Sequence, residues 1–228
     1  MKPFLKWAGG KTQLLDVIIN ELPEDIDKTY TYVEPFVGAG TIFFYFLNKN
    51  KFKKYIINDI NTKLINVYEV IRDNIELLIE NLNDIKEKYL SFEYLSKDRE
   101  EMYYEVRNKF NSDSIDKIKL ATYFIFINKT CFNGLYRENT KGYYNVPIGN
   151  YKNPQIFDEK HLRDISKLLN KKDKNGELIV TILNLEYNEL EQYINKNTFV
   201  YFDPPYRPIS IGGFTNYNKS GFDDESQK

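Results

Sequence analysis

The stretch VEPFVGAGT at residues 33–41 decides the fold of this 228-residue chain. It is typical of a strand that ends in a tight glycine turn, and the apolar run at residues 42–47 predicts a helix directly behind it. Gly38 and Gly40 allow the backbone to turn sharply, and they let a ligand approach the main chain because no Cβ stands in the way. Phe43 occupies the third glycine position of the GxGxxG fingerprint, so we do not expect a dinucleotide site.

The next apolar segment, YIINDIN at residues 55–61, predicts a second strand that ends in an acid. Asp59 follows the glycines by about twenty residues, where doubly wound α/β folds use an acid to accept hydrogen bonds from ribose hydroxyls. A further strand is expected at residues 179–183, directly before Asn184. This order predicts an α/β fold with a nucleoside site at the carboxyl edge of its sheet.

The last strand-like run, residues 198–202, leads into the sequence DPPY. The carboxylate of Asp203 can accept a hydrogen bond from an exocyclic amino group, and Pro204 has no backbone N–H to donate. Pro205 stiffens the same turn, and Tyr206 can lie face-on against a flat heterocycle. Taken alone, the segment fits a proline-stopped turn equally well. After a glycine turn and a ribose acid, however, it favours a nucleoside cofactor without pyrophosphate and a base amino group as the target.

The N-terminal segment FLKWAGGKT, residues 4–12, ends like a phosphate-binding P-loop. A P-loop requires glycine where this chain has Leu5 and a strand before the loop, for which too few residues precede it. A nucleotide triphosphatase is therefore excluded. What remains is an aromatic loop with Trp7 between Lys6 and Lys11.

The composition limits the other classes of function. One cysteine and one histidine give no disulfide framework and no metal site, and His161 is interpreted as a surface residue. No signal peptide is visible and the longest apolar run, residues 121–127, is too short to span a bilayer, so we expect a cytoplasmic protein without a membrane partner. The net charge of −1 argues against nucleic acid in general, but phosphate contacts need only one basic face. The stretch from residue 129 to residue 152 is the most informative candidate for that face.

A helical region separates the second strand from the third. Apolar residues recur with a period near 3.6 across residues 64–82, and further helices are expected at residues 100–110 and 115–128. A turn at residues 140–142, followed by a strand at residues 143–146, predicts a hairpin. We therefore expect a mainly helical lobe at residues 61–177 with the hairpin at its tip. This lobe is inserted into a sheet domain formed by residues 1–60 and 178–228.

Six motifs in order carry a resemblance to a known family: FLKWAGGK (residues 4–11), EPFVGAG (34–40), NDIN (58–61), NGLYR (133–137), NVPIG (145–149) and DPPY (203–206). The chain resembles the Dam-type, D12 class DNA adenine-N6 methyltransferases, which include the GATC-recognising methylases of restriction–modification systems. The resemblance covers the chain from Lys2 to its end. It implies a Rossmann-like S-adenosylmethionine-dependent methyltransferase sheet with an inserted target-recognition lobe. The cofactor would be S-adenosylmethionine, and the target would be adenine in duplex DNA, at GATC.

The resemblance also assigns roles to residues of the sheet domain. Transfer itself would involve Asp203, Pro204, Pro205 and Tyr206. The cofactor would contact Trp7, Lys11, Phe36, Gly38, Gly40, Asp59, Ile60, Asn184 and Asp203. Asn184 stands where some members of the family carry an acid near the adenine of the cofactor. The N6 lone pair is delocalised into the ring, so Asp203 and the Pro204 carbonyl would free it by accepting its two hydrogens.

In the inserted lobe, the resemblance assigns DNA contacts to Lys6, Phe132, Asn133, Leu135, Arg137, Pro147 and Lys152. Arg137 would form a bidentate contact with guanine, worth roughly 1–3 kcal/mol of discrimination. Lys6 would contact the first guanine of the site, and Phe132 would act as a wedge beside the flipped base. Ordinary hairpin packing is the alternative for Phe132, Leu135 and Pro147. A surface ion pair with Glu138 or another acid is the alternative for Arg137. Some relatives carry arginine at the position of Asn150, so that contact would be either missing here or replaced, for example by Lys152.

In the family, the chain continues beyond residues 214–217 with a helix and further strands. We therefore expect the strand at residues 198–202 to form an exposed sheet edge. A truncated gene product, one half of a split enzyme whose second chain supplies these strands, and a fragment of a longer chain remain open. The leading hypothesis is a site-specific DNA adenine-N6 methyltransferase. The alternatives are a catalytically inactive or partner-dependent DNA-binding fragment, and transfer to an RNA base or a protein amide.

Overall fold

The structure is a computed structural model that describes residues 1–7 and 11–204. Its centre is a four-stranded sheet in the order β3-β2-β1-β4, in which every pair of neighbours is parallel. The strands are β1 (Thr31–Glu34), β2 (Lys54–Asn58), β3 (Val180–Leu183) and β4 (Thr198–Val200). All four expected strands are therefore present, and the α/β prediction is confirmed. β3 and β4 are the edge strands of the described sheet, and β4 is half-buried.

The sheet core is aromatic. Tyr32 on β1 and Tyr55 on β2 are fully buried, and α2 (Thr41–Lys49) packs Phe43 and Phe46 against them. Burial of each large apolar side chain contributes about 1.5–3 kcal/mol. The phenol of Tyr55 keeps a partner inside this core, because its hydroxyl donates to Phe46 O at 2.9 Å. The helix expected behind the glycine turn is thus confirmed as α2.

The helical region begins with two helices where the sequence pattern is continuous. Apolar residues recur without interruption across residues 64–82, yet α3 (Thr62–Asp73) and α4 (Ile75–Ser91) are separated at Asn74, whose φ is −136° and ψ is 38°. A single-residue break keeps the helical periodicity of both flanks, so the sequence does not reveal it. The helical face predicted across residues 64–82 is therefore confirmed, and it is carried by two helices.

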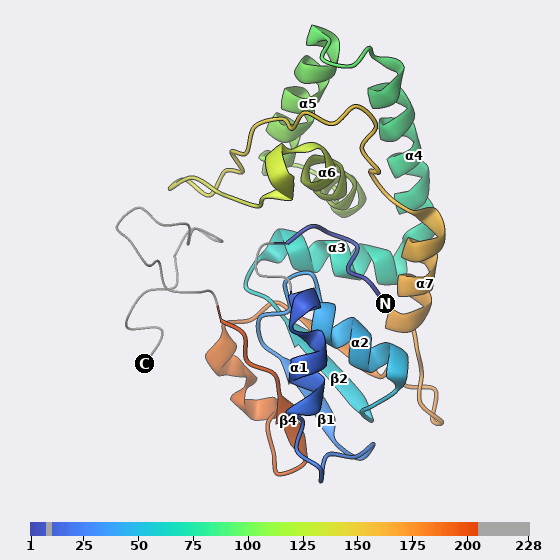
Figure 1. The fold of residues 1–228 in the computed structure, drawn as a ribbon, viewed down its shortest axis with the longest axis vertical. Helices are drawn as coiled ribbons and strands as arrows, with labels where there is room; N and C mark the ends of the chain where they lie inside the picture. The colour runs from blue at the N-terminus through green and yellow to red at the C-terminus, as the bar shows by residue number, and fades with distance from the viewer. Residues whose placement is uncertain (8–10, 205–228) are drawn as a thin grey trace.

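The helices α5 (Lys97–Phe110) and α6 (Lys117–Thr130) confirm the two further helical predictions. Their first turns are capped by the side chains of Ser96 and Asp116, which accept backbone N–H groups. Figure 1 shows α4, α5 and α6 stacked beyond α3, which contacts α6 on one side and β3 on the other. The helix α7 (Glu159–Leu169) packs beside α3 and leads the chain back to the sheet. The remaining short elements are η1 (Lys11–Gln13), α1 (Leu15–Asn20), η2 (Phe132–Gly134) and η3 (Tyr187–Tyr193).

Residues 131–149, called the hairpin below, extend from the end of α6 (Figure 1). Antiparallel bridges join Glu138 to Tyr144 and Cys131 to Ile148, and the turn is closed by Asn139 N–H, which donates to Tyr143 O at 2.9 Å. Residues 143–146 form a single bridge, at Tyr144, and not the regular strand predicted there. The reversal of the chain is formed as predicted.

In the described part of the chain, no helix is long and apolar enough to cross a membrane. The same residues contain no group of three His, Cys, Asp or Glu side chains that could hold a metal ion.

Candidate active site

Three loops meet at the carboxyl edge of the sheet. They follow β1, β2 and β4, and parallel strands bring such loops to a common edge. The first is the glycine turn, in which Gly38 has φ 49° and Gly40 has φ 72°. A Cβ on Gly38 would lie 2.9 Å from the Trp7 indole, and one on Gly40 would lie 2.7 Å from the Tyr68 hydroxyl. Both positions therefore require glycine for the backbone angle and for the space.

Asp59 joins the first loop to the second. One carboxylate oxygen accepts the Gly38 N–H at 3.0 Å, and the other accepts the Asn61 N–H at 3.0 Å. Burial raises the pKa of Asp59 to about 6, although these two backbone hydrogen bonds act to lower it. Each oxygen retains a second lone pair, so the carboxylate has the capacity to accept two ligand hydroxyls as well.

The amide of Asn184 lies beside this loop. It donates to Asp59 O at 2.7 Å and accepts from the Thr62 hydroxyl at 2.8 Å. Ile60, half-buried, belongs to the same loop. The structure thus brings together Asp59, Ile60 and Asn184, which come from two strands widely separated in the sequence.

Asn58 is a site residue that sequence reasoning missed. Its buried side chain donates to Pro35 O and Leu185 O, both at 3.0 Å, and accepts from Leu185 N–H at 2.8 Å. It therefore fixes the loops after β1 and β3 relative to each other. The sequence feature that could have indicated Asn58 is its amide side chain at the end of an otherwise apolar strand, directly before Asp59.

Glu34 is the second missed residue, although it lies inside the stretch that decides the fold. Its carboxyl group is buried at the end of β1 and accepts from the Tyr32 hydroxyl at 2.6 Å. Burial raises the pKa of Glu34 to about 8, and the charges of Asp203 and Asp59 act in the same direction. Three carboxyl groups thus gather at one edge of the sheet, and this one holds a proton at neutral pH.

Asp203 lies at the lip after β4, and its Oδ2 is 2.6 Å from Lys11 Nζ. Both side chains are largely shielded from solvent. This ion pair ties the N-terminal loop to the end of β4. Pro204 belongs to the same lip, whereas Pro205 and Tyr206, also predicted to act in transfer, lie outside the described residues.

Aromatic rings flank the lip. Phe36 contacts Phe202 edge-on with ring centroids 5.1 Å apart, and it also contacts Tyr187 at 5.8 Å. Phe202 is 52% exposed, which is unusual for a phenylalanine beside a sheet edge. Tyr187 and Phe202 were not predicted, because their proximity depends on loops after different strands.

Trp7 lies between the glycine turn and the hairpin. Its indole packs against Gly38 and stacks on Tyr136 with centroids 5.3 Å apart. Lys6, the adjacent residue, is held by Asn128, whose amide accepts the Lys6 N–H at 2.9 Å and donates to Lys6 O at 2.8 Å. The Lys6 ammonium lies 4.5 Å from the centre of the Tyr151 ring.

The residues predicted to contact DNA gather on the hairpin and at its base. Phe132 is 51% exposed and donates its N–H to the carbonyl of Pro147, itself exposed, so simple packing does not account for either side chain. Asn133 is exposed, and Leu135 is half-buried against the core. Lys152 is exposed, while its carbonyl accepts from Arg99 at 3.0 Å.

Arg137 is not paired with Glu138, so an ion pair between these two residues is wrong. Its Nε donates to Asn145 Oδ1 at 2.7 Å, across the hairpin. Glu138 instead accepts from the Tyr136 hydroxyl at 2.5 Å and lies 3.7 Å from Lys63 Nζ.

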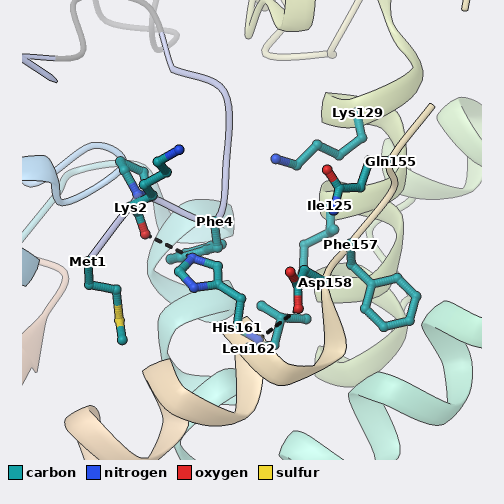
Figure 2. Close-up of a pocket in the computed structure, with 11 residues that line it drawn as sticks. Met1, Lys2, Phe4, Ile125, Lys129, Gln155, Phe157, Asp158, His161 and Leu162 are labelled. Carbon is teal, nitrogen blue, oxygen red and sulfur yellow. Dashed lines mark hydrogen bonds between the residues drawn. The ribbon is translucent and has the colours of Figure 1, made fainter.

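A cavity of about 490 Å³ lies elsewhere, between the N-terminal segment, α6 and α7. Figure 2 shows Lys129, Phe157 and His161 among its lining residues, with His161 Nε2 bonded to Lys2 O at 2.9 Å. No residue predicted to act in transfer or cofactor binding lines this cavity within the described chain. The candidate active site is therefore defined by the strand ends and not by the cavity.

Comparison with known proteins adds independent findings. Residues 7–228 match a family model described as D12 class N6 adenine-specific DNA methyltransferase. The chain is 47% identical to the Type II methyltransferase M.MjaIII of Methanocaldococcus jannaschii, over 100% of this chain and 77% of that protein. It is 36% identical to the Type II methyltransferase M1.LlaDCHI of Lactococcus lactis subsp. cremoris, over 100% of this chain and 74% of that protein. It is 35% identical to a DNA adenine methylase of Vibrio cholerae, over 99% of this chain and 73% of that protein.

Proposed function

Because the chain belongs to the family of D12 class N6 adenine-specific DNA methyltransferases, we propose that it transfers a methyl group from S-adenosylmethionine to adenine N6 in duplex DNA, at GATC sites. One observation carries the proposal most directly. The carboxylate of Asp203 stands at the same sheet edge as the Gly38 turn and the carboxylate of Asp59. A carboxylate that can accept from an amine thereby lies at the same edge as a glycine turn and an acid that suit a nucleoside, together called the cofactor cradle below, and this supports the proposal.

The residues at the cradle fit S-adenosylmethionine. Gly38 has no side chain at the floor, and the Asp59 carboxylate has unused lone pairs for the two ribose hydroxyls. The negative charge of Asp59 and Asp203 suits a ligand that carries a sulfonium and an ammonium group. When bound, this cofactor supplies a methyl group that is already activated by the positive sulfur.

Asp203 and Pro204 act on the incoming amine. Asp203 accepts one N6 hydrogen and the Pro204 carbonyl accepts the other, which frees the nitrogen lone pair for in-line attack at about 3–3.5 Å. Lys11 holds the Asp203 carboxylate in place before the base arrives. In transfer, the N6 amine would gain the methyl carbon as the carbon–sulfur bond breaks, and sulfur would keep that electron pair as a neutral thioether. The surplus proton of the amine would leave toward Asp203 or water. No covalent intermediate with the protein is required.

The base reaches this lip only after it leaves the duplex, which costs a few kcal/mol. The exposed ring of Phe132 suits a wedge that replaces the flipped base in the stack. Arg137 presents a planar guanidinium group whose Nε donates to Asn145, and Lys6 lies at the base of the same hairpin. These donors match the acceptors of guanine in the major groove, which supports GATC as the site.

The test is methyl incorporation from labelled S-adenosylmethionine into two duplexes that differ only in whether they contain GATC. We expect incorporation into the GATC duplex alone. Equal incorporation into both would contradict the site, while the transfer reaction would stand. Cofactor binding without incorporation into either duplex would contradict transfer by this chain and would favour the DNA-binding alternative.

A further inference from the structure

The side chains of residues 136–138 in the hairpin point to two opposite sides of the segment. Successive side chains of an extended segment point to opposite sides, so Tyr136 and Glu138 share one side and Arg137 points to the other. The contacts agree with this alternation. Tyr136 is 3% exposed and faces the protein interior, whereas the side chain of Arg137 donates to Asn145 on the opposite arm of the hairpin.

The inward side forms a compact polar contact with the start of α3. The Tyr136 hydroxyl donates to Glu138 Oε1 at 2.5 Å, and Lys63 Nζ lies 3.7 Å from the same oxygen. The side chain of Asn61 lies near the Tyr136 hydroxyl, since it acts to lower the pKa of Tyr136 against the effect of burial. Burial lowers the pKa of Lys63, and the Glu138 carboxylate opposes that effect. We call these four residues, Asn61, Lys63, Tyr136 and Glu138, the hairpin anchor.

The hairpin anchor lies next to both loops proposed to bind the cofactor, the glycine turn and the loop of Asp59. Asn61 donates its N–H to the Asp59 carboxylate at 3.0 Å, so one contact leads to the ribose acid. On its ring face, Tyr136 stacks on Trp7, and Trp7 packs directly against Gly38. One tyrosine thus contacts the glycine turn through Trp7 and the acid loop through Asn61. The residue that follows it is Arg137.

We propose that Tyr136 and Glu138 are positioning residues that couple occupation of the cofactor cradle to recognition of DNA by Arg137. This proposal rests on the proposed function. A ligand that fixes the Asp59 loop and Trp7 restricts Tyr136 and Glu138, and therefore also the backbone of Arg137 between them. Coupling of this kind is reciprocal, so cofactor and cognate duplex each strengthen the binding of the other by the same factor.

The experiment measures that factor with the full 228-residue chain. The Kd for a labelled GATC duplex is measured with and without saturating S-adenosylhomocysteine, and the Kd for S-adenosylhomocysteine with and without the duplex. We expect a coupling factor of about fivefold or more, within the usual range for linked sites. Tyr136→Phe keeps the ring stack and removes the hydroxyl, and Glu138→Gln removes the charge. Both should bring the factor close to one.

Matched controls make the same chemical changes outside the hairpin anchor. Tyr94→Phe alters an exposed tyrosine, and Glu105→Gln breaks an exposed pair with Lys109 on α5. Both should retain the wild-type factor. If Tyr136→Phe proves unstable, Glu138→Gln and a double-mutant cycle with Lys63→Met measure the same contact.

The outcomes separate the two proposals. A wild-type chain that binds neither ligand would contradict the proposed function and the inference with it. A wild-type chain that binds both ligands independently would overturn the inference alone. A wild-type coupling factor that persists in Tyr136→Phe and Glu138→Gln would also overturn it, since the contact would then serve only to hold the hairpin.

Discussion

Lys11 Nζ lies 2.6 Å from Asp203 Oδ2, although the two residues stand near opposite ends of the described chain. The side chains are 11% and 24% exposed, so this pair is more shielded than an ordinary surface ion pair. Its attraction is correspondingly less screened by solvent and salt. The geometry pairs one carboxylate oxygen of Asp203, Oδ2, with Lys11.

Removal of the lysine charge should therefore impair transfer. We expect Lys11→Met to lower kcat/KM for methyl transfer by about tenfold or more, because Asp203 loses the group that orients it. Lys11→Arg should retain more activity, since it keeps the charge. The measurement is steady-state methyl incorporation, with the Kd for S-adenosylhomocysteine determined in parallel. Lys109→Met, which breaks the exposed pair with Glu105, is the control and should leave the rate unchanged.

Asp203 itself should be essential. Asp203→Ala removes the acceptor for an N6 hydrogen, and loss of one such group at a reacting centre costs about 100-fold to 1000-fold in kcat. DNA binding should persist, because Asp203 is not among the residues proposed to contact DNA. His161→Ala is the control, since His161 bonds to Lys2 O beside the cavity of Figure 2 and lies in no proposed step. Undiminished transfer by Asp203→Ala would refute the mechanism.

The glycine turn gives a test of stability with a matched control. Gly38→Ala places a Cβ 2.9 Å from Trp7 at φ 49°, whereas Gly176→Ala meets nothing within 4 Å at φ 83°. Both substitutions carry the cost of a left-handed backbone, about 1–2 kcal/mol. Only Gly38→Ala must also displace Trp7, so it should lower the free energy of unfolding further and weaken cofactor binding. The measurement is chemical denaturation of both variants. If Gly38→Ala and Gly176→Ala lowered the free energy of unfolding equally, the contact with Trp7 would be unimportant for stability.

The parts of this molecule that sequence predicts are those set by local pattern. The strand–glycine–helix order at residues 31–49 follows from apolar periodicity and from two glycines at which no other residue fits. Asp59 follows a strand, β2, as predicted, because its position in the sequence pattern is a local property. Its role toward a ribose stays a prediction. The break at Asn74 escaped prediction, since one non-helical residue leaves the pattern of both flanks intact.

Residues missed by sequence reasoning depend on contacts between distant segments. The pKa of Glu34 is raised by burial under neighbours from several elements, which no window around residue 34 contains. The stack of Trp7 on Tyr136 also joins distant segments of the chain. The partner of Arg137, Asn145, lies across the hairpin and was not predicted either. Whether Glu138 pairs with Arg137 or Lys63 depends on which side of the hairpin faces α3, and only the fold decides that.

Glu34 should make stability depend on pH. Its pKa is raised from 4.5 to about 8 in the folded protein, so the native state holds a proton that the unfolded chain has released. The free energy of unfolding should therefore fall as pH rises between these values and level off above about 8. Glu34→Gln keeps an acceptor for the Tyr32 hydroxyl and should remove this component of the slope.

The measurement is denaturant unfolding of wild type and Glu34→Gln between about pH 6.5 and 8. Asp59, whose pKa is about 6, is largely deprotonated in this range. It therefore adds little to the change of the free energy of unfolding with pH. Glu105→Gln serves as an exposed control and should follow the wild-type slope. A slope that is identical in wild type and Glu34→Gln would contradict a neutral Glu34 in the folded protein.

Recognition of DNA should divide between Arg137 and Lys152. Arg137→Lys replaces a planar fork by a single ammonium and should cost roughly 1–3 kcal/mol of discrimination between GATC and a duplex with guanine replaced. Lys152→Met should weaken binding to both duplexes equally and reduce the dependence of the Kd on salt, because a phosphate contact carries no sequence information. Equilibrium binding between about 50 and 200 mM salt distinguishes the two effects. If Arg137→Lys instead weakened both duplexes alike, Arg137 would be a phosphate contact, and the assignment of guanine to this side chain would be wrong.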